Sequence, residues 1–171
     1  MKNTIKALAI LAICGFAGTA SAQNTASANG YAAGNIIAPV SVRPNENGGG
    51  INFGSFVAGS GTVTESGNHI TNYSNSQMSP GSNQGSPADA SFTVSGQANY
   101  SVNLSTAVLG GLPAGLTLSA LTVTPGTNPV GLGAGGSVNV TIGGTLTDDG
   151  SYTTPGAFNA ANAFSLTAAY N

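Results

Sequence analysis

Few side chains in this 171-residue chain could perform chemistry. The sequence holds one Cys, Cys14, and one His, His69. A zinc site needs several His, Cys or carboxylate ligands, and thiol catalysis needs a Cys with an activating partner. His69 lies in a polar stretch with no second His, so we interpret it as a solvated loop residue.

The carboxylates offer two further arrangements. Nothing in the sequence places a partner carboxylate beside Glu65 or Asp89, so a two-carboxylate hydrolase is unsupported. Asp148 and Asp149, followed by Gly150, could bind calcium, but Asp and Gly also form turns, and we favour a turn. We therefore expect no catalytic site, no metal and no cofactor, and we classify the protein as a non-enzyme.

Composition excludes another class of protein and indicates the fold class. Three Lys or Arg and 5 Asp or Glu give a formal net charge of −2. A nucleic-acid-binding protein needs clustered basic side chains to neutralise phosphates, so we expect no nucleic-acid partner. The 26 Gly and 8 Pro, with abundant Ser, Thr, Asn and Ala, indicate short extended segments divided by turns. The composition thus predicts an all-β domain.

Residues 1–22 are typical of a secretory signal peptide. Lys2 and Lys6 supply the positive start, and Ala7–Phe16 is an apolar run too short to span a bilayer. Small residues at 20–22 form a cleavage pattern, so the mature chain is expected to begin near Gln23. The alternative, acylation of Cys14 as in a lipoprotein, is disfavoured by bulky Ile13 before it.

Cleavage there changes the charge and the cysteine content. It leaves Arg43 as the one base against five acidic side chains, a net charge of −4, and it removes Cys14. The mature protein is then expected to be exported, with no disulfide and no transmembrane segment. Its stability must come from packing, backbone hydrogen bonds or another chain.

Strand-like segments follow one another along the rest of the chain, at a spacing typical of a β-sandwich or barrel. Ala90–Ser95 and Tyr100–Ser105 alternate apolar and polar residues and, joined by a turn at 96–99, predict a hairpin. Gly67–Ala88 has no apolar period and is predicted to be a long polar loop, in which residues around Tyr73 could form a short hairpin. The other expected strands are Ile36–Val42, Ile51–Val57, Gly61–Glu65, Leu116–Val123 with a bulge near Ala120, Val138–Leu146 with a bend or bulge at Gly143-Gly144, and Phe164–Tyr170.

The two ends of the mature chain suggest a relationship between them. The last strand, with Phe164, Leu166 and Tyr170 on one face, is followed by no later strand, so if the sandwich needs a neighbour beside it, that neighbour must come from elsewhere. Residues 23–35 form a small-residue segment that could fill a groove as an extended strand. A frayed tail and a first strand of its own sheet are the alternatives for this segment. The residues that share the small-residue parity are Ala26, Ala28, Gly30 and Ala32.

Several motifs occur in an order that resembles a known family, the bacterial exported domain of unknown function 4402. Two segments depart from the family pattern, a longer insertion at 67–88 and an interruption at 158–163. The motifs that carry the resemblance are Ile37–Val42, Ile51–Phe56, Ala90–Gly96, Tyr100–Leu104, Val140–Leu146 and Phe164–Tyr170.

The resemblance implies an immunoglobulin-like sandwich of about seven to nine antiparallel strands, similar to subunits of chaperone–usher pili. In such pili, the N-terminal extension of the next subunit completes each sandwich by β-strand addition. The expected organisation is a signal peptide at 1–22, a donor strand or first strand at 23–35 and a β-sandwich at 36–171.

The expected function is that of a structural subunit of a fimbrium, which passes through the periplasm to the cell surface or the medium. Its expected partners are copies of itself or related subunits, a periplasmic chaperone and an outer-membrane usher. The alternative is a self-complete, monomeric binding module that recognises a glycan or protein through residues 67–88. An enzyme ranks below both interpretations.

Overall fold

The computed structural model describes residues 27–45, 48–73 and 86–171, and the chain divides into two units. The first unit is Met1–Asn35, in which residues 27–35 have no regular secondary structure and are all exposed. The second unit, Ile36–Asn171, is all-β, and its described residues include no helix. No helix in the described part of the chain is long and apolar enough to cross a membrane.

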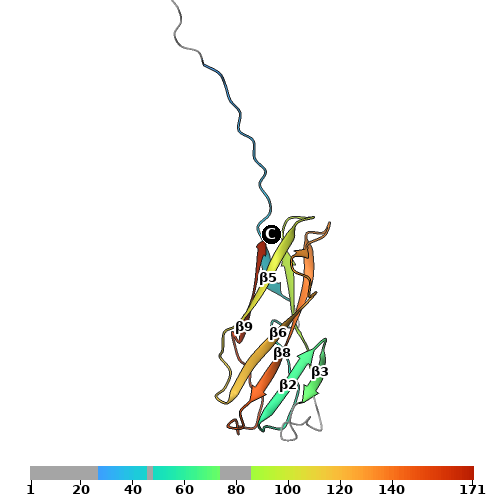
Figure 1. Ribbon diagram of the computed structural model, residues 1–171, viewed down its shortest axis with the longest axis vertical. Coiled ribbons are helices and arrows are strands. Elements are labelled where there is room, and N and C mark those ends of the chain that lie inside the picture. Colours follow the sequence, from blue (N-terminus) through green and yellow to red (C-terminus); the bar gives the residue numbers. More distant parts are fainter. Residues whose placement is uncertain (1–26, 46–47, 74–85) are drawn as a thin grey trace, which may run out of the picture. The chain divides into compact units, whose positions relative to one another are not determined.

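The larger of two antiparallel sheets is built around one long strand, β8 (Figure 1). One side of β8 pairs with β4 along its first half and with β2 along its second half, and β6 pairs with its other side. β1 extends the sheet beyond β4, and β3 extends it beyond β2. The strands are β1 (Ser41–Pro44), β2 (Gly61–Ser66), β3 (His69–Tyr73), β4 (Ala90–Ser95), β6 (Leu116–Thr124) and β8 (Ser137–Asp148).

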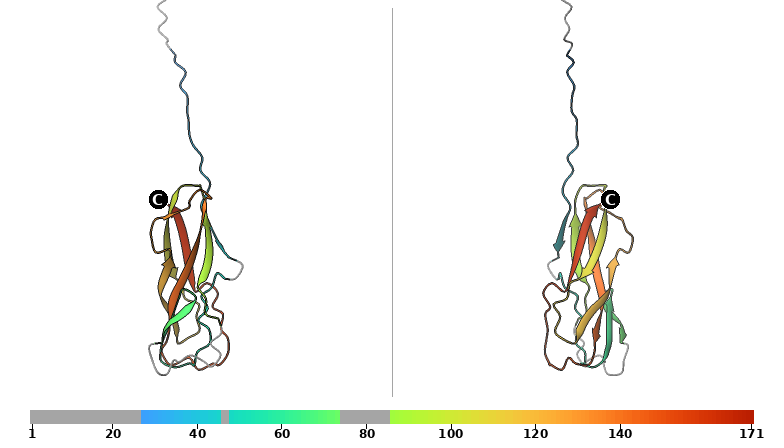
Figure 2. Two further views of the ribbon diagram at one scale, coloured as in Figure 1. Left: turned by 90° about the vertical axis from the view of Figure 1, so that its right-hand side faces the viewer. Right: turned by 60° about the vertical axis from the view of Figure 1, so that its left-hand side comes forward.

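The smaller sheet has three strands in the order β7-β5-β9, and Figure 2 shows β9 running beside β5. Its strands are β5 (Ser101–Val108), β7 (Val130–Gly131) and β9 (Phe164–Tyr170). Alternate residues of β5 and β9 face the larger sheet, so the apolar face of each strand is buried between the sheets.

Apolar side chains fill the space between the sheets in two clusters. The first cluster contains residues of β2, β6 and β8, and the second joins β4 and β8 of the larger sheet to β5 and β7 of the smaller one. Each fully buried Val or Leu contributes about 1.5–3 kcal/mol, so these clusters hold the two sheets together. The buried members are Phe53, Val63, Leu116, Leu118 and Leu146 in the first cluster, and Val94, Val102, Val130, Leu132 and Val140 in the second.

The predicted hairpin of residues 90–105 is wrong, although both of its strands are present. β4 belongs to the larger sheet and β5 to the smaller, so the Gly96–Asn99 turn carries the chain from one sheet to the other. Period-2 alternation shows only that each strand has one buried face, and the two faces here meet across the core.

Three other strand predictions need correction. The first strand begins at Ser41 rather than Ile36, and residues 51–57 form no strand but include an isolated bridge between Asn52 and Ala88. The predicted loop at 67–88 begins with strand β3, which forms a hairpin with β2 and ends at Tyr73, and residues 74–85 lie outside the described part. β3 follows a two-residue turn in which Gly67 and Asn68 both have positive φ, the geometry of a type I′ hairpin.

The predictions for the second half of the chain are confirmed in more detail. β6 has its register break between Ser119 and Thr122, and Ala120 has a φ of 49°, as expected for the predicted bulge. The final strand runs from Phe164 to Tyr170 as predicted.

Candidate functional site

One side of β9, the last strand, has no partner among the described strands. β9 lies at the end of the smaller sheet and pairs only with β5. The amide of Asn171 donates to Ser101 O, and that of Leu109 donates to Ala163 O. The N–H and C=O groups of odd-numbered residues along β9 therefore point toward β5. The N–H and C=O groups of even-numbered residues therefore point to the open side. These residues include Phe164, Leu166 and Tyr170, the three interface candidates predicted from the sequence.

The same three residues turn their side chains to the core. Phe164 packs against the first cluster, whereas Leu166 and Tyr170 pack against the second, and all three are half-buried. β1, the edge strand of the larger sheet, lies next to β9 across the sandwich. The two open edges therefore flank the same side of the apolar interior.

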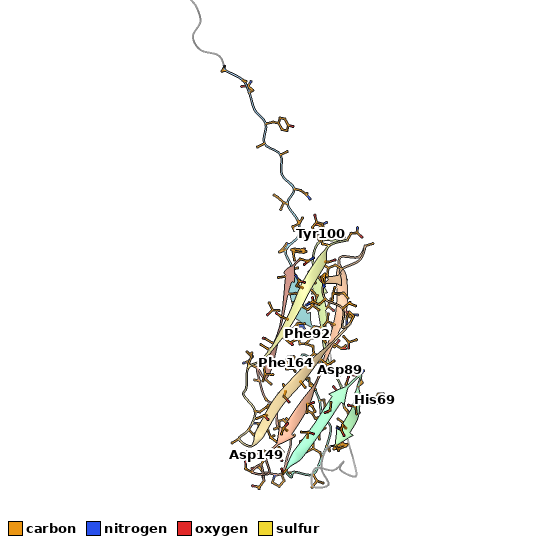
Figure 3. All side chains as sticks on the ribbon, viewed as in Figure 1. His69, Asp89, Phe92, Tyr100, Asp149 and Phe164 are labelled. Carbon is orange, nitrogen blue, oxygen red and sulfur yellow. The ribbon has the colours of Figure 1, made fainter. Side chains whose placement is uncertain are left out.

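A cavity of about 250 Å³ opens between the sheets beside the start of β9, and apolar side chains form part of its wall. Phe92 and Phe164 meet in its wall, with their ring centroids 6.3 Å apart, and Figure 3 shows the two side chains close together. The segment from Phe158 to Ala163, which departs from the family pattern, lines the cavity just before β9 begins. The other large apolar residues in its lining are Ile51, Phe53, Leu112, Leu118 and Leu166.

At the other end of β9, Tyr170 holds the start of the folded unit. Its hydroxyl donates a hydrogen bond to Ala38 O at 2.5 Å and accepts one from Gln97 N at 2.6 Å. The amide of Ala38 donates in turn to Gln97 Oε1 at 3.2 Å. The clamp formed by Tyr170, Gln97 and Ala38 fixes the chain just after the N-terminal segment.

The donor candidates lie in the N-terminal unit. Ala28, Gly30 and Ala32 are exposed and belong to no strand, and Ala26 lies outside the described residues. An added Cβ at Gly30 would meet nothing within 4 Å. Tyr31, between the small residues, is 96% exposed. The described part of this segment is therefore exposed and belongs to no strand.

Two carboxylates that sequence reasoning left isolated are brought together. Glu65, in β2, is fully buried, and its carboxyl group interacts with the Asp89 side chain and with the backbone of Asn68 and His69. Asp89 lies beside it, immediately before β4. Burial foremost, and then the neighbouring Asp89 carboxylate, raise the pKa of Glu65 to about 8. No spacing signal joins residues 24 apart; the Gly67-Asn68 dipeptide, a hairpin signal, could have indicated only the local turn.

The other polar candidates have structural roles. Asp148 accepts hydrogen bonds from Gly150 N at 2.8 Å and Gly59 N at 3.2 Å, and Asp149 accepts one from Ser151 N at 2.8 Å. The Ser151 hydrogen bonds lower the pKa of Asp149. These contacts fit the turn interpretation of this segment.

His69 is exposed at the start of β3, at the position labelled in Figure 3. No three His, Cys, Asp or Glu side chains cluster as metal ligands within the described ranges. Comparison with protein-family models, curated proteins and solved structures finds no match to this chain. The family resemblance therefore rests on the order of the sequence motifs alone.

Proposed function

We propose that the protein is an exported, non-catalytic structural subunit of a fimbrium that assembles by β-strand addition between subunits. The observation that carries this proposal is the open edge of β9 beside a cavity between two sheets. We further propose that the two sheets form an immunoglobulin-like sandwich that lacks one strand, and that the chain belongs to the exported family whose motif order it resembles.

The open edge explains why such a subunit would need a partner. Unpaired N–H and C=O groups along an open strand edge form a template on which another strand can pair. A strand added to β9 would bond to the even-numbered residues from Phe164 to Tyr170 and would cover Phe164 and Leu166. A periplasmic chaperone would cover this edge in transit. At an outer-membrane usher, the donor strand of the next subunit would replace the chaperone on this edge.

The proposed donor is residues 23–35 of a second copy or of a related subunit. The described part of this segment is exposed and unpaired, and its small residues allow close approach to a groove. Main-chain hydrogen bonds would supply most of the attachment, because Ala and Gly side chains bury little area. A net charge of −4 spread over 149 residues would let many copies touch without strong repulsion.

The alternative is a self-complete monomer that binds a ligand through residues 67–88. Such a monomer must pair its terminal strands within one chain. Residues 27–35 join no strand, and β9 pairs only with β5 among the described residues, so we favour assembly.

The experiment that tests the proposal compares residues 23–171 with a chain that lacks residues 23–33. The shortened chain is expected to stay monomeric, to be less stable, and to regain stability when a peptide of residues 23–33 is added. Thermal unfolding and light scattering measure the two effects. Two equally stable monomers that ignore the peptide would refute strand addition by this segment.

A further inference from the structure

The N-terminal segment contains the dipeptide Asn29-Gly30, whose chemistry strand addition does not use. Both residues are exposed and belong to no strand, and within the described part of the chain neither makes a hydrogen bond. A Cβ added to Gly30 would meet nothing within 4 Å. The described residues therefore leave the backbone between Asn29 and Gly30 unrestrained.

An Asn that precedes Gly can react with its own backbone. The nitrogen of Gly attacks Cγ of Asn, the Cγ–Nδ2 bond breaks, and Nδ2 leaves as ammonia with the proton of the attacking N–H. Glycine favours this attack, because it lacks a Cβ and permits backbone conformations that other residues avoid. The product is a five-membered succinimide ring.

Water then opens the ring at one of its two carbonyl carbons. The hydroxyl of water adds to that carbon, the carbon–nitrogen bond breaks, and the hydrogen of water goes to the nitrogen. Opening at Cγ gives aspartate. Opening at the backbone carbonyl gives isoaspartate, in which the main chain runs through Cβ and Cγ and a carboxylate remains on Cα.

Two other Asn residues show what distinguishes position 29. Asn35 is also exposed and outside any strand, but Ile36 follows it, and a β-branched side chain hinders the attack. A second Asn-Gly dipeptide occurs at residues 47–48, of which Asn47 lies outside the described residues. Its attacking nitrogen is held, because Gly48 N donates to Asn45 O at 3.0 Å. Of the three, only Asn29 is followed by a nitrogen that is neither hindered nor held.

We propose that Asn29 is a self-modification site that limits how long an unassembled subunit can donate its strand, an inference that rests on the proposed function. Isoaspartate adds one atom to the main chain, so residues after position 29 lose the register that decides which side chains face the groove. It also adds a carboxylate to residues 23–35, which have no charged side chain. A strand already added to β9 is protected, because its hydrogen-bonded ladder prevents the backbone rotation that the attack needs.

Peptide mapping by mass spectrometry tests the reaction on residues 23–171, aged in alkaline buffer at a concentration where light scattering detects no polymer. Base speeds the attack, because the nucleophile is the deprotonated amide nitrogen. Asn29 is expected to lose its side-chain amide about tenfold or more faster than Asn35, and faster than Asn47. Gly30→Ala, which restores a Cβ, should slow the loss about tenfold. If Asn29 keeps its amide as long as Asn35 does, the site is refuted, whatever the outcome for strand addition.

Light scattering during assembly then measures the consequence. Chains in which isoaspartate predominates at position 29 are expected to assemble about tenfold more slowly than fresh chains. Aged Asn29→Gln chains should assemble within about twofold of fresh ones, because Gln would have to close a larger ring. Asn29→Asp, which carries the charge on an unchanged main chain, should also stay within about twofold.

The outcomes separate the modification from strand addition. Equal assembly of fresh and fully converted chains would overturn the time limit and leave strand addition intact. Fresh chains that do not assemble would refute the proposed function and the time limit with it, whereas peptide mapping would still decide whether Asn29 reacts.

Discussion

Phe92 of β4 and Phe164 of β9 meet edge to face between the two sheets, with their ring centroids 6.3 Å apart and their planes at 84°. β4 belongs to the larger sheet and β9 to the smaller, so this contact joins the sheets at the wall of the cavity. Edge-to-face pairs contribute about 0.5–1.5 kcal/mol beyond the area that they bury. The pair therefore stabilises the sandwich at the edge where we propose that a strand adds.

Phe164→Ala is expected to lower the free energy of unfolding by about 3 kcal/mol, through the lost pair and the enlarged cavity. Urea denaturation of residues 23–171 measures this change. Phe164→Leu keeps the apolar volume and should lose less than half as much. Equal losses in the two variants would mean that the aromatic contact and the cavity do not contribute as argued.

Leu166 and Thr167 form a matched pair for testing assembly, because they lie on opposite faces of β9. Leu166 is half-buried against the second cluster, whereas Thr167 is exposed. Leu166→Asn should slow polymer growth at least tenfold by placing an amide in the apolar groove. Thr167→Asn should leave growth within about twofold. Light scattering during assembly follows both, and a similar effect of the two variants would argue against a groove on the inner face.

Gly143→Ala is expected to destabilise the chain by about 2–3 kcal/mol, because its Cβ would stand 2.5 Å from the Glu65 carbonyl oxygen. The backbone must shift to relieve this contact, since a carbonyl in a paired strand cannot rotate away. Gly135→Ala is the control, because nothing lies within 4 Å of its added Cβ. Denaturation midpoints of the two variants should differ clearly. Equal midpoints would show that the backbone around Gly143 can move away from the Glu65 carbonyl at little cost in stability.

Glu65 predicts a pH dependence of stability. Its pKa is raised from 4.5 to about 8 in the folded chain, so the folded state holds this proton more tightly than the unfolded state. The stabilisation is complete below about pH 4.5 and is lost as the pH rises through about 8. The free energy of unfolding should fall by on the order of 1 kcal/mol per pH unit between pH 5 and 8.

The variant Glu65→Gln should remove this slope, whereas Asp149→Asn should keep it. Asp149 has a lowered pKa, and its contribution changes only in acid, below the window of the measurement. A slope that survives in Glu65→Gln would assign the pH dependence to another group.

Local patterns predicted the strands of the second half of the chain well, because each strand there carries its own evidence. The apolar alternation of β9 and the slip in β6 at Ala120 can be read without knowing any partner. The prediction of a β4–β5 hairpin is wrong because it depended on the partner of each strand. Two alternating segments joined by a short turn have the same sequence pattern whether they pair with each other or lie in different sheets.

The parts of the site that the sequence did not reveal depend on distant contacts. Glu65 and Asp89 meet only because β8 exchanges β4 for β2 at Gly143, a change that no local pattern encodes. The cavity depends on how residues 158–163 come to line the same space as Phe92, and a loop of one Phe followed by Ala and Asn residues does not indicate such a path. By contrast, the inward-facing positions of Phe164, Leu166 and Tyr170 could be predicted. In a strand with one buried face, every second residue is apolar, and that alternation is visible in the sequence.

The most direct test of strand addition is a disulfide formed between two chains of residues 23–171, which contain no Cys. If Ala28 and Gly30 face the groove, Asn29 lies outward, as Thr167 does on β9. One chain carries a single Cys at position 27, 29, 31 or 33, and a mass-labelled chain carries Thr167→Cys. We predict that one of these odd positions forms a mixed disulfide and that Gly30→Cys does not. Monomers without any mixed disulfide at all four odd positions would contradict strand addition.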